Sequence, residues 1–337
     1  MKKNLLYIGN RLYKHGFNKT SIETLGAFLA EEGYNVVYTS NKKNHLVRLF
    51  DMMMTTFLKA KKVDYILIDT YSTSSFWYAF FCSQLARLFA IKYIPILHGG
   101  DLPNRLKNNP NLCKLIFKNA YTNVAPSPYL LQEFKNSGFE NVLFIPNSIQ
   151  LEEYEFKNNI QLEPKLLWVR AFASIYNPKM AVEVLKLLQG KYPEASLTMV
   201  GPDKDGSLLE TKEFAKSLGL KVNFTGKLSK KEWTSLAAEH EVFINTTHFD
   251  NTPVSVIEAM ALGLPVVTTN VGGIPYLLTN EKNALLVDDN ATGAMVQAIV
   301  LLLSDAVLAQ QLVVNARLLV ESMDWQQVKL QWHQLLA

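Results

Sequence analysis

The sequence lacks any long apolar run. Hydrophobic residues make up 48% of the 337, yet no stretch reaches the roughly 18 uninterrupted residues that a membrane-spanning helix needs. The most apolar stretch, residues 76–91, is interrupted by Ser83, Gln84 and Arg87, so we expect a buried amphipathic helix there. The apolar stretch at residues 5–8 is too short for an export signal. These absences predict a cytoplasmic protein.

Cysteine and charge are also scarce. The two cysteines, Cys82 and Cys113, form no metal-binding motif, and we expect free buried thiols in a reducing compartment. Charged residues make up 19% of the chain, with a net charge of +4 and no low-complexity block. No feature predicts a nucleic-acid partner.

The charge is divided unevenly along the chain. Residues 1–160 carry 19 basic and 12 acidic residues, or +7, and residues 161–337 carry 15 and 18, or −3. A basic first half is compatible with peripheral contact at the inner face of an anionic membrane. A solvated, lysine-rich surface explains the same charges, so both interpretations stay open.

Short β-rich runs alternate with helical patterns along the chain. Strands are expected at residues 4–8, 35–39, 65–69, 93–97, 123–125 and 142–145, and again at 165–169, 196–200, 221–225, 241–245, 265–268 and 284–287. This alternation is typical of parallel sheets covered by helices on both faces. We therefore expect an α/β protein with two doubly wound, Rossmann-like domains.

The expected domains are residues 1–150 and 165–320. A polar, acidic linker at 151–164 separates them, and a helical segment at 321–337 follows a break near 322–324. Ligands of open parallel sheets bind beyond the carboxyl ends of the strands. Two such sheets facing each other would leave a cleft, so the residues that follow strands are the informative ones.

The most informative segment follows the strand at 241–245. Asp250 and Asn251 lead into a helix in which Thr252 is the expected N-cap and Pro253 the first helical residue. The free N–H groups and the dipole of a helix start suit a diphosphate or a polar sugar. A carboxylate such as Glu258 can accept hydrogen bonds from the vicinal hydroxyls of a ribose. Both acids also have an interpretation without a ligand, in which Asp250 merely caps the helix and Glu258 is a solvated charge.

The same segment resembles the signature of a known family. Seven residues separate Asp250 from Glu258, followed by Ala-Met-Ala at 259–261 and Gly-Leu-Pro-Val at 263–266. This pattern resembles the retaining GT-B glycosyltransferases of group 1, which form glycosyltransferase family 4. The resemblance implies that Glu258 binds the ribose and that residues 250–253 contact the transferred sugar. The family usually has Glu at the first acid, so Asp250 is one methylene shorter.

Further donor contacts are implied by the resemblance. Arg170 follows a strand and Lys179 lies in the first turn of the next helix, where the family places cations that bind the donor phosphates. The usual glycine before the arginine is absent here, and an ordinary surface lysine would look like Lys179. The strand and turn at 222–228 would contact the nucleobase through Gly226 and Leu228.

Two loops of the first half match the family less specifically. Residues 9–20 contain Gly16 and end in the capping box Thr20-x-x-Glu23, and the resemblance implies that this loop approaches the donor diphosphate or the acceptor. A plain turn would look the same. His98 follows the strand at 93–97, where the family often has a histidine that contacts the transferred sugar. A lone histidine is more often structural.

The resemblance thus implies a GT-B fold whose final segment crosses back to the first domain. It implies an enzyme that moves a sugar from a nucleotide-sugar donor to a glycan or lipid-linked glycan acceptor with retention, in surface polysaccharide biosynthesis. The catalytic candidates are His98 and Asp250, and no protein nucleophile stands out.

The last expectations concern cofactors and alternative functions. No metal or other cofactor is expected, because the family is metal-independent and turn chemistry explains Asp203 and Asp205. Two alternatives stay open, a nucleotide-sugar epimerase of the same fold and a non-catalytic nucleotide-sugar-binding protein.

Overall fold

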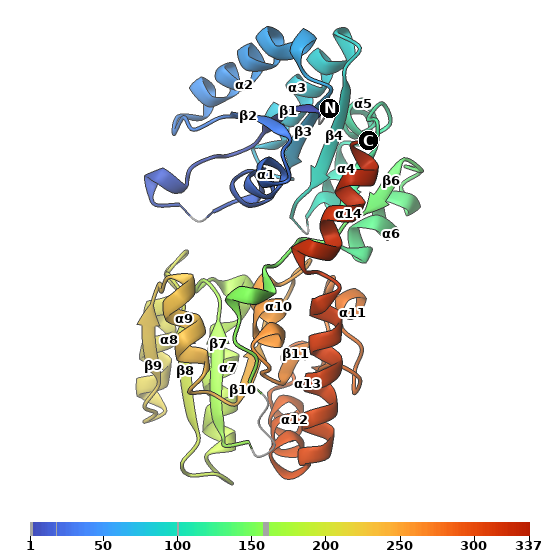
Figure 1. The fold of residues 1–337 in the computed structure, drawn as a ribbon. Coiled ribbons are helices and arrows are strands. Elements are labelled where there is room, and N and C mark those ends of the chain that lie inside the picture. The colour runs from blue at the N-terminus through green and yellow to red at the C-terminus, as the bar shows by residue number, and fades with distance from the viewer. Residues whose placement is uncertain (1–2, 18, 100, 158–161) are drawn as a thin grey trace. The chain divides into compact units, whose positions relative to one another are not determined.

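The chain folds into two units, each built around a six-stranded parallel sheet (Figure 1). The computed structural model describes residues 3–17, 19–99, 101–157 and 162–337. The first unit comprises residues 1–148 and 325–337, and the second comprises residues 149–324. The predicted pair of doubly wound α/β sheets is confirmed.

The sheet of the first unit has the strand order β2-β1-β3-β4-β5-β6. Its strands are β1 (Asn4–Ile8), β2 (Asn35–Thr39), β3 (Tyr65–Thr70), β4 (Lys92–Leu97), β5 (Asn123–Ala125) and β6 (Val142–Phe144). Its helices are α1 (Ser21–Glu31), α2 (His45–Lys59), α3 (Phe76–Leu88), α4 (Leu102–Asn108), α5 (Pro110–Phe117), α6 (Pro128–Asn136) and α14 (Trp325–Leu335), with short 3-10 turns at η1 (Tyr13–His15) and η2 (Ala60–Lys62).

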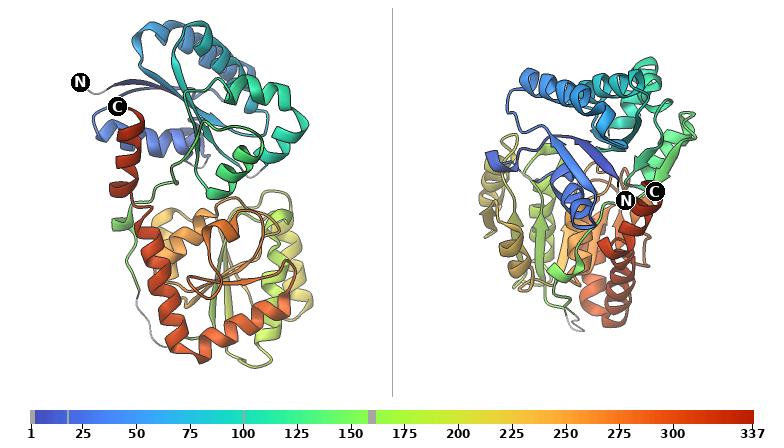
Figure 2. Two further views of the ribbon diagram at one scale, coloured as in Figure 1. Left: turned by 90° about the vertical axis from the view of Figure 1, so that its right-hand side faces the viewer. Right: turned by 45° about the horizontal axis from the view of Figure 1, so that its top comes forward.

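The interior strand β1 shows why this sheet is covered on both faces. Successive side chains of a strand point to opposite faces. Leu5 and Tyr7 therefore pack with α1 and α14, which lie side by side on this face (Figure 2). There Phe28 stacks on Trp325 at 4.9 Å between ring centroids. Leu6 and Ile8 pack with α2 and α3 on the other face. A strand buried on both faces gives the continuous apolar run from which it was predicted.

The sheet of the second unit has the order β12-β11-β10-β7-β8-β9. Its strands are β7 (Lys165–Val169), β8 (Ser196–Val200), β9 (Asn223–Gly226), β10 (Val242–Asn245), β11 (Val266–Thr269) and β12 (Leu285–Val287). Its helices are α7 (Pro178–Leu188), α8 (Ser207–Ser217), α9 (Lys230–Ala237), α10 (Val254–Ala261), α11 (Ile274–Leu277), α12 (Thr292–Ser304) and α13 (Ala306–Glu321), with 3-10 turns at η3 (Leu151–Glu153) and η4 (Ser174–Tyr176).

The stretch expected as a linker is seen in part. Residues 158–161 lie outside the described residues. The part before them packs within the second unit, where Tyr154 is buried and the Lys157 N–H donates to the Leu262 carbonyl at 2.9 Å. The break near 322–324 is confirmed, since α13 ends at Glu321 and α14 begins at Trp325.

Two local expectations are wrong. Helix α10 begins at Val254 rather than at Pro253, because Pro253 has extended backbone angles (φ −70°, ψ 107°) and takes the N-cap position that was assigned to Thr252. The helix expected at 76–91 ends at Leu88, and it is not buried all round, since Trp77, Phe81 and Leu88 are exposed. Its first turns carry apolar side chains on both faces.

The cysteines and the longest helices bear on two further expectations. Cys82 and Cys113 are free and buried, as expected, and burial raises the pKa of Cys82 to about 12. Among the described residues, no single helix is long and apolar enough to span a membrane, and α12 and α13 pass that test of length and composition only as a pair bent by 102°.

Candidate functional site

The loops that follow β7 and β10 meet in the second unit through a buried ion pair. These strands are neighbours in the sheet, so their carboxyl ends lie at the same edge. The Arg170 Nη2 donates to Asp250 Oδ2, and both side chains are only 14% exposed. The guanidinium also lies over the Tyr176 ring at 4.0 Å from its centroid. The structure therefore joins the predicted phosphate-binding arginine to the predicted sugar-contacting acid.

Two opposing effects act on the pKa of Asp250 in this pair. Burial raises the pKa of Asp250, while Arg170 and the backbone N–H groups of Asn251 and Thr252 act in the opposite direction. The Arg170 Nε is buried and has no hydrogen-bond partner among the described residues. A buried donor of this kind is costly to leave unpaired, so this edge of the guanidinium is suited to an anionic ligand.

Two glycines after β11 hold the loop that carries Asp250. The Gly273 N–H donates to the Asp250 carbonyl at 2.7 Å. A Cβ at Gly273 would lie 2.0 Å from the Asn251 carbonyl oxygen, and one at Gly272 would lie 2.3 Å from that of Asp250. Only glycine permits this approach. Sequence reasoning missed both residues, although a Gly-Gly pair four residues after the end of a predicted strand was a usable signal.

Glu258 is fixed by a tyrosine that sequence reasoning also missed. The Tyr154 hydroxyl donates to Glu258 Oε1 at 2.6 Å. Burial raises the pKa of Glu258, and the hydrogen bond from Tyr154 and the charge of Lys230 counteract that rise. Lys230 also lies over the Tyr154 ring at 4.5 Å. Glu258 is thus a partly buried, oriented acceptor rather than a fully solvated charge. Tyr154 lies in the expected linker, where nothing in the sequence pointed to it.

Lys179 does not join this group in the structure. Its Nζ donates to Glu210 of α8 at 2.8 Å, and both side chains are about half exposed or more. This is an ordinary surface ion pair, which contributes little on its own.

The turns after β8 and β9 lie beside the loop of Arg170. The Gly201 N–H donates to the Gly226 carbonyl at 2.9 Å, and a Cβ at Gly201 would lie 1.8 Å from the Arg170 carbonyl oxygen. Gly226 has a positive φ of 72°, and Leu228 packs against the core of the second unit. The predicted nucleobase turn is therefore next to the predicted phosphate site.

The carboxylates of Asp203 and Asp205 accept hydrogen bonds within their own turn, and Asp205 also accepts from Ser174 of the loop after β7. Asp205 Oδ2 accepts from the Ser174 N–H and Oγ, each at 2.9 Å, and Asp203 Oδ1 accepts from the Gly206 N–H at 3.1 Å. The hydrogen bonds that Asp205 accepts from Ser207 and Ser174 lower its pKa, and the bond from the Ser207 side chain contributes most. The turn interpretation of this pair fits its contacts.

In the first unit, His98 belongs to a buried polar group at the carboxyl ends of β1, β3 and β4. Its Nε2 lies 2.9 Å from Asp69 Oδ1, which also accepts from the Tyr7 hydroxyl at 3.0 Å. The imidazole stacks on Tyr71 at 5.1 Å. Asp69 is fully buried and was missed, although its place at the end of a predicted strand follows the same rule that selected His98.

In the loop at residues 9–20 of the first unit, Gly16 is not closely packed. Gly16 ends η1 with a φ of 86°, and no atom lies within 4 Å of an added Cβ. The capping box at the start of α1 is confirmed, with the Thr20 N–H donating to Glu23 at 3.2 Å. Asn18 in this loop and Gly100 after His98 lie outside the described residues.

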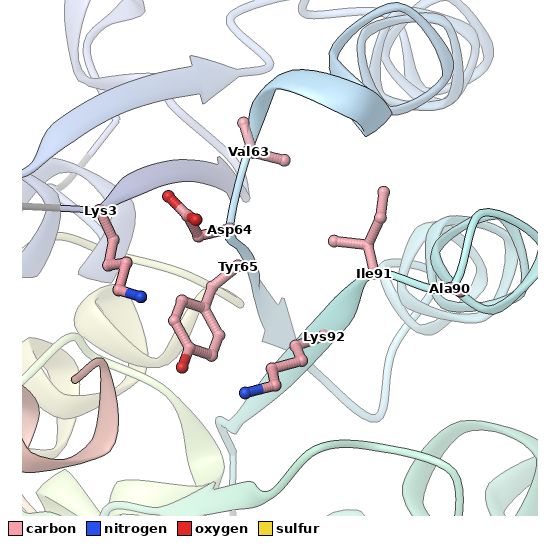
Figure 3. Close-up of a pocket in the computed structure, with 7 residues that line it drawn as sticks. All are labelled: Lys3, Val63, Asp64, Tyr65, Ala90, Ile91 and Lys92. Carbon is pink, nitrogen blue, oxygen red and sulfur yellow. The ribbon is translucent and has the colours of Figure 1, made fainter.

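A hollow of about 260 Å³ lies at the opposite edge of the first sheet (Figure 3). Lys3, Asp64, Tyr65 and Lys92 line it, and all precede or begin strands. Lys92 Nζ lies 5.3 Å from the centroid of the Tyr65 ring. Because the ligands of parallel sheets bind at the carboxyl ends, this hollow is not part of the candidate site.

Two parallel doubly wound sheets, with polar side chains gathered after the strands, define the GT-B class of fold. Residues 150–319, just over half of the chain, match the family described as "Glycosyl transferases group 1". The chain belongs to this family. Its fold is shared with the crystal structure of Anabaena HepE in complex with UDP and glucose, at a TM-score of 0.79, with 16% identity and 99% of each chain covered.

Two curated relatives match parts of the sequence. The sulfoquinovosyl transferase SQD2 of Arabidopsis thaliana is 33% identical over 102 residues, which are 30% of this chain and 19% of that protein. The Escherichia coli UDP-Gal:alpha-D-GlcNAc-diphosphoundecaprenol alpha-1,3-galactosyltransferase is 23% identical over 181 residues, 49% of this chain and 46% of that protein. The chain therefore spans less than half the length of these relatives.

Proposed function

We propose that the chain transfers a sugar from a nucleotide diphosphate-sugar to a glycan or lipid-linked glycan acceptor during polysaccharide synthesis. Family membership supports the reaction class. The observation that carries the proposal is the partly buried, hydrogen-bonded group Arg170, Asp250 and Glu258 around the loop after β10 and the helix that follows it. A relative named as a galactosyltransferase for a diphosphoundecaprenol-linked sugar supports the acceptor class.

Glu258 is assigned to the ribose of the donor. A carboxylate has about four acceptor positions, and Tyr154 uses one of them through Oε1. The remaining positions suit two vicinal hydroxyls. Tyr154 acts as a positioning residue, because its bond fixes the carboxylate and favours the ionised form that accepts hydrogen bonds.

Arg170 is assigned to the diphosphate. Its contact with Asp250 orients the guanidinium, and the unpaired Nε leaves a donor for a phosphate oxygen. As the sugar leaves, negative charge builds on the β-phosphate, and a fixed cation in a buried site stabilises that charge. Lys179 can bind the diphosphate only after its ion pair with Glu210 breaks. Gly226 and Leu228 keep their assignment to the nucleobase.

The sugar itself is assigned to residues 250–253 and to His98. The Asp250 carboxylate accepts hydrogen bonds from Arg170 and from the N–H groups of Asn251 and Thr252. It therefore holds both the guanidinium and this loop. The Thr252 hydroxyl is buried without a partner among the described residues, as expected of a ligand contact. Gly16 keeps its assignment to the diphosphate or acceptor.

Retention of the anomeric configuration is part of the proposal. It follows from the family resemblance, with attack from the face of the departing diphosphate. An NMR time course of the first product from an α-linked donor sugar should show the α-anomer. A first-formed β-anomer would contradict retention while leaving donor binding unaffected.

The test of donor binding is a thermal-shift screen of the protein against UDP, GDP, ADP and their sugar conjugates. Uridine compounds come first, because HepE was solved with UDP. A ligand at a hundred times its dissociation constant stabilises the folded state by about 2.7 kcal/mol. We expect one base series to shift the wild type and to shift Glu258→Ala much less. The exposed Glu213→Ala on α8 is the control and should respond like the wild type. No shift by any nucleotide would overturn the proposal.

A further inference from the structure

One face of the first unit exposes an unusual concentration of large apolar side chains. They lie on α2 and α3, which pack against each other on the same side of the sheet (Figures 1 and 2). The exposed residues are Leu46, Val47, Phe50, Met54, Phe57 and Leu58 on α2 and Trp77, Phe81 and Leu88 on α3. We call these nine residues the apolar face.

The apolar face follows from helical spacing. On α2 the exposed residues recur at intervals of three and four, which places them along one stripe. The opposite stripe, with Met52 and Thr56, is buried against the sheet. Helix α2 therefore exposes more large apolar side chains than it buries. Large apolar side chains exposed together on two neighbouring helices mark an interaction site on a folded protein.

The charges that border the apolar face have one sign. Lys42 and Lys43 precede α2, Lys61 and Lys62 follow it, and all four are exposed. Helix α3 adds an exposed Arg87 and contains no acidic residue.

Two further charged groups lie on α2 and are less exposed than the lysines. Asp51 is the one acid of α2, and its carboxylate accepts a hydrogen bond from the Thr39 hydroxyl at 3.2 Å. Arg48 is buried and donates to the Lys42 carbonyl at 2.9 Å. The exposed border is therefore cationic.

We propose that the apolar face and its lysine border dock the first unit on an anionic lipid bilayer. Amphipathic surfaces with Phe, Leu and Trp on one side and Lys at the edges lie in the bilayer interface, held by apolar burial and attraction to anionic headgroups. Charge complementarity favours this occupant. The inference goes beyond the proposed reaction, because docking needs no nucleotide.

The test is binding of the purified chain to vesicles without nucleotide. We expect binding to equimolar phosphatidylglycerol and phosphatidylcholine that weakens as salt rises from about 0.1 M to about 0.5 M NaCl, and about tenfold or more weaker binding to phosphatidylcholine alone. The variants Phe50→Gln/Phe57→Gln and Lys61→Gln/Lys62→Gln should each bind anionic vesicles about tenfold or more weakly. The exposed pair Leu209→Gln/Val307→Gln of the second unit is the control and should bind like the wild type.

A single tryptophan gives a second readout. Trp77 is 43% exposed, whereas Trp168, Trp233, Trp325 and Trp332 are buried. Brominated anionic lipids should therefore quench the fluorescence of the wild type and leave that of Trp77→Phe nearly unchanged.

Three results would overturn the docking proposal. They are an absence of vesicle binding by the wild type, equal binding to neutral and anionic vesicles, and unchanged binding by both face variants. Concentration-dependent dimers that Phe50→Gln/Phe57→Gln abolishes, without vesicle binding, would instead assign the face to a second copy of the chain. None of these results bears on nucleotide binding, so docking and the proposed reaction can fail separately.

Discussion

Three candidate site residues, Arg170, Glu258 and His98, are each held by one neighbouring side chain. Asp250 holds Arg170, Tyr154 holds Glu258, and Asp69 holds His98. Pairing offsets the cost of taking each group out of water, and it also fixes the direction in which the remaining donors and acceptors point. For His98, a carboxylate at Nε2 favours the tautomer with a proton there and leaves Nδ1 as the acceptor.

Asp69→Asn tests this positioning role. The amide keeps the shape and an acceptor oxygen but removes the charge that selects the His98 tautomer. We expect the rate of donor consumption at saturating donor to fall by about tenfold or more, while nucleotide affinity stays unchanged. The control is Asp64→Asn, an exposed aspartate beside the same strand.

A merely structural role for Asp69 would lower thermal stability and nucleotide binding together with the rate. The imidazole NMR signals of His98 separate the two cases, because only the positioning role requires them to change in a folded variant.

The sequence pointed to Asp250, Glu258 and Arg170 as candidate donor contacts but not to Tyr154 or Asp69, for a physical reason. Asp250, Glu258 and Arg170 follow strands or lie on a helix whose periodicity is visible locally. Tyr154 reaches Glu258 across 104 positions, and Asp69 meets His98 across 29. Contacts of that range depend on the order of strands in the sheet, which local patterns do not state.

At the scale of elements, the alternation of strands and helices was predictable nearly to the residue. Strands β1, β2, β5, β7 and β8 begin and end where the apolar runs predicted. The errors arose where one side chain decides between alternatives. Pro253 caps α10 instead of starting it, and α3, which was expected as a buried amphipathic helix, exposes the large apolar side chains of Trp77, Phe81 and Leu88.

The close contact between the loops after β10 and β11 gives a prediction at this scale. Gly273→Ala would place a Cβ 2.0 Å from the Asn251 carbonyl oxygen, so the loop at 250–252 must move. We expect a loss of about 1–3 kcal/mol in the free energy of unfolding and of nucleotide binding as well. Thermal unfolding and nucleotide titration check both.

Gly293→Ala is the matched control for that variant. No atom lies within 4 Å of an added Cβ at Gly293, which sits in the first turn of α12. Alanine there should leave binding unchanged and stabilise by up to about 1 kcal/mol. Equal behaviour of the two variants would contradict the account of the loop contact.

At the scale of the whole molecule, each sheet gathers its polar residues at the carboxyl ends of its strands. In the second unit these are Arg170, Asp250 and Glu258, and in the first they are Asp69 and His98. The first unit adds a cationic, apolar face on α2 and α3. A lipid-linked acceptor and a membrane-docking face are chemically consistent with each other, although each is tested separately.

The central claim is that the group around the start of α10 binds a nucleotide diphosphate-sugar. The most direct test is calorimetric titration of the nucleotide selected by thermal shift into the wild type, Glu258→Gln, Arg170→Met and the control Glu213→Gln. Loss of a hydrogen bond to a charged group predicts about ten- to hundredfold weaker binding for the first two variants, with the control unchanged. Wild-type affinity in folded Glu258→Gln and Arg170→Met would contradict the account.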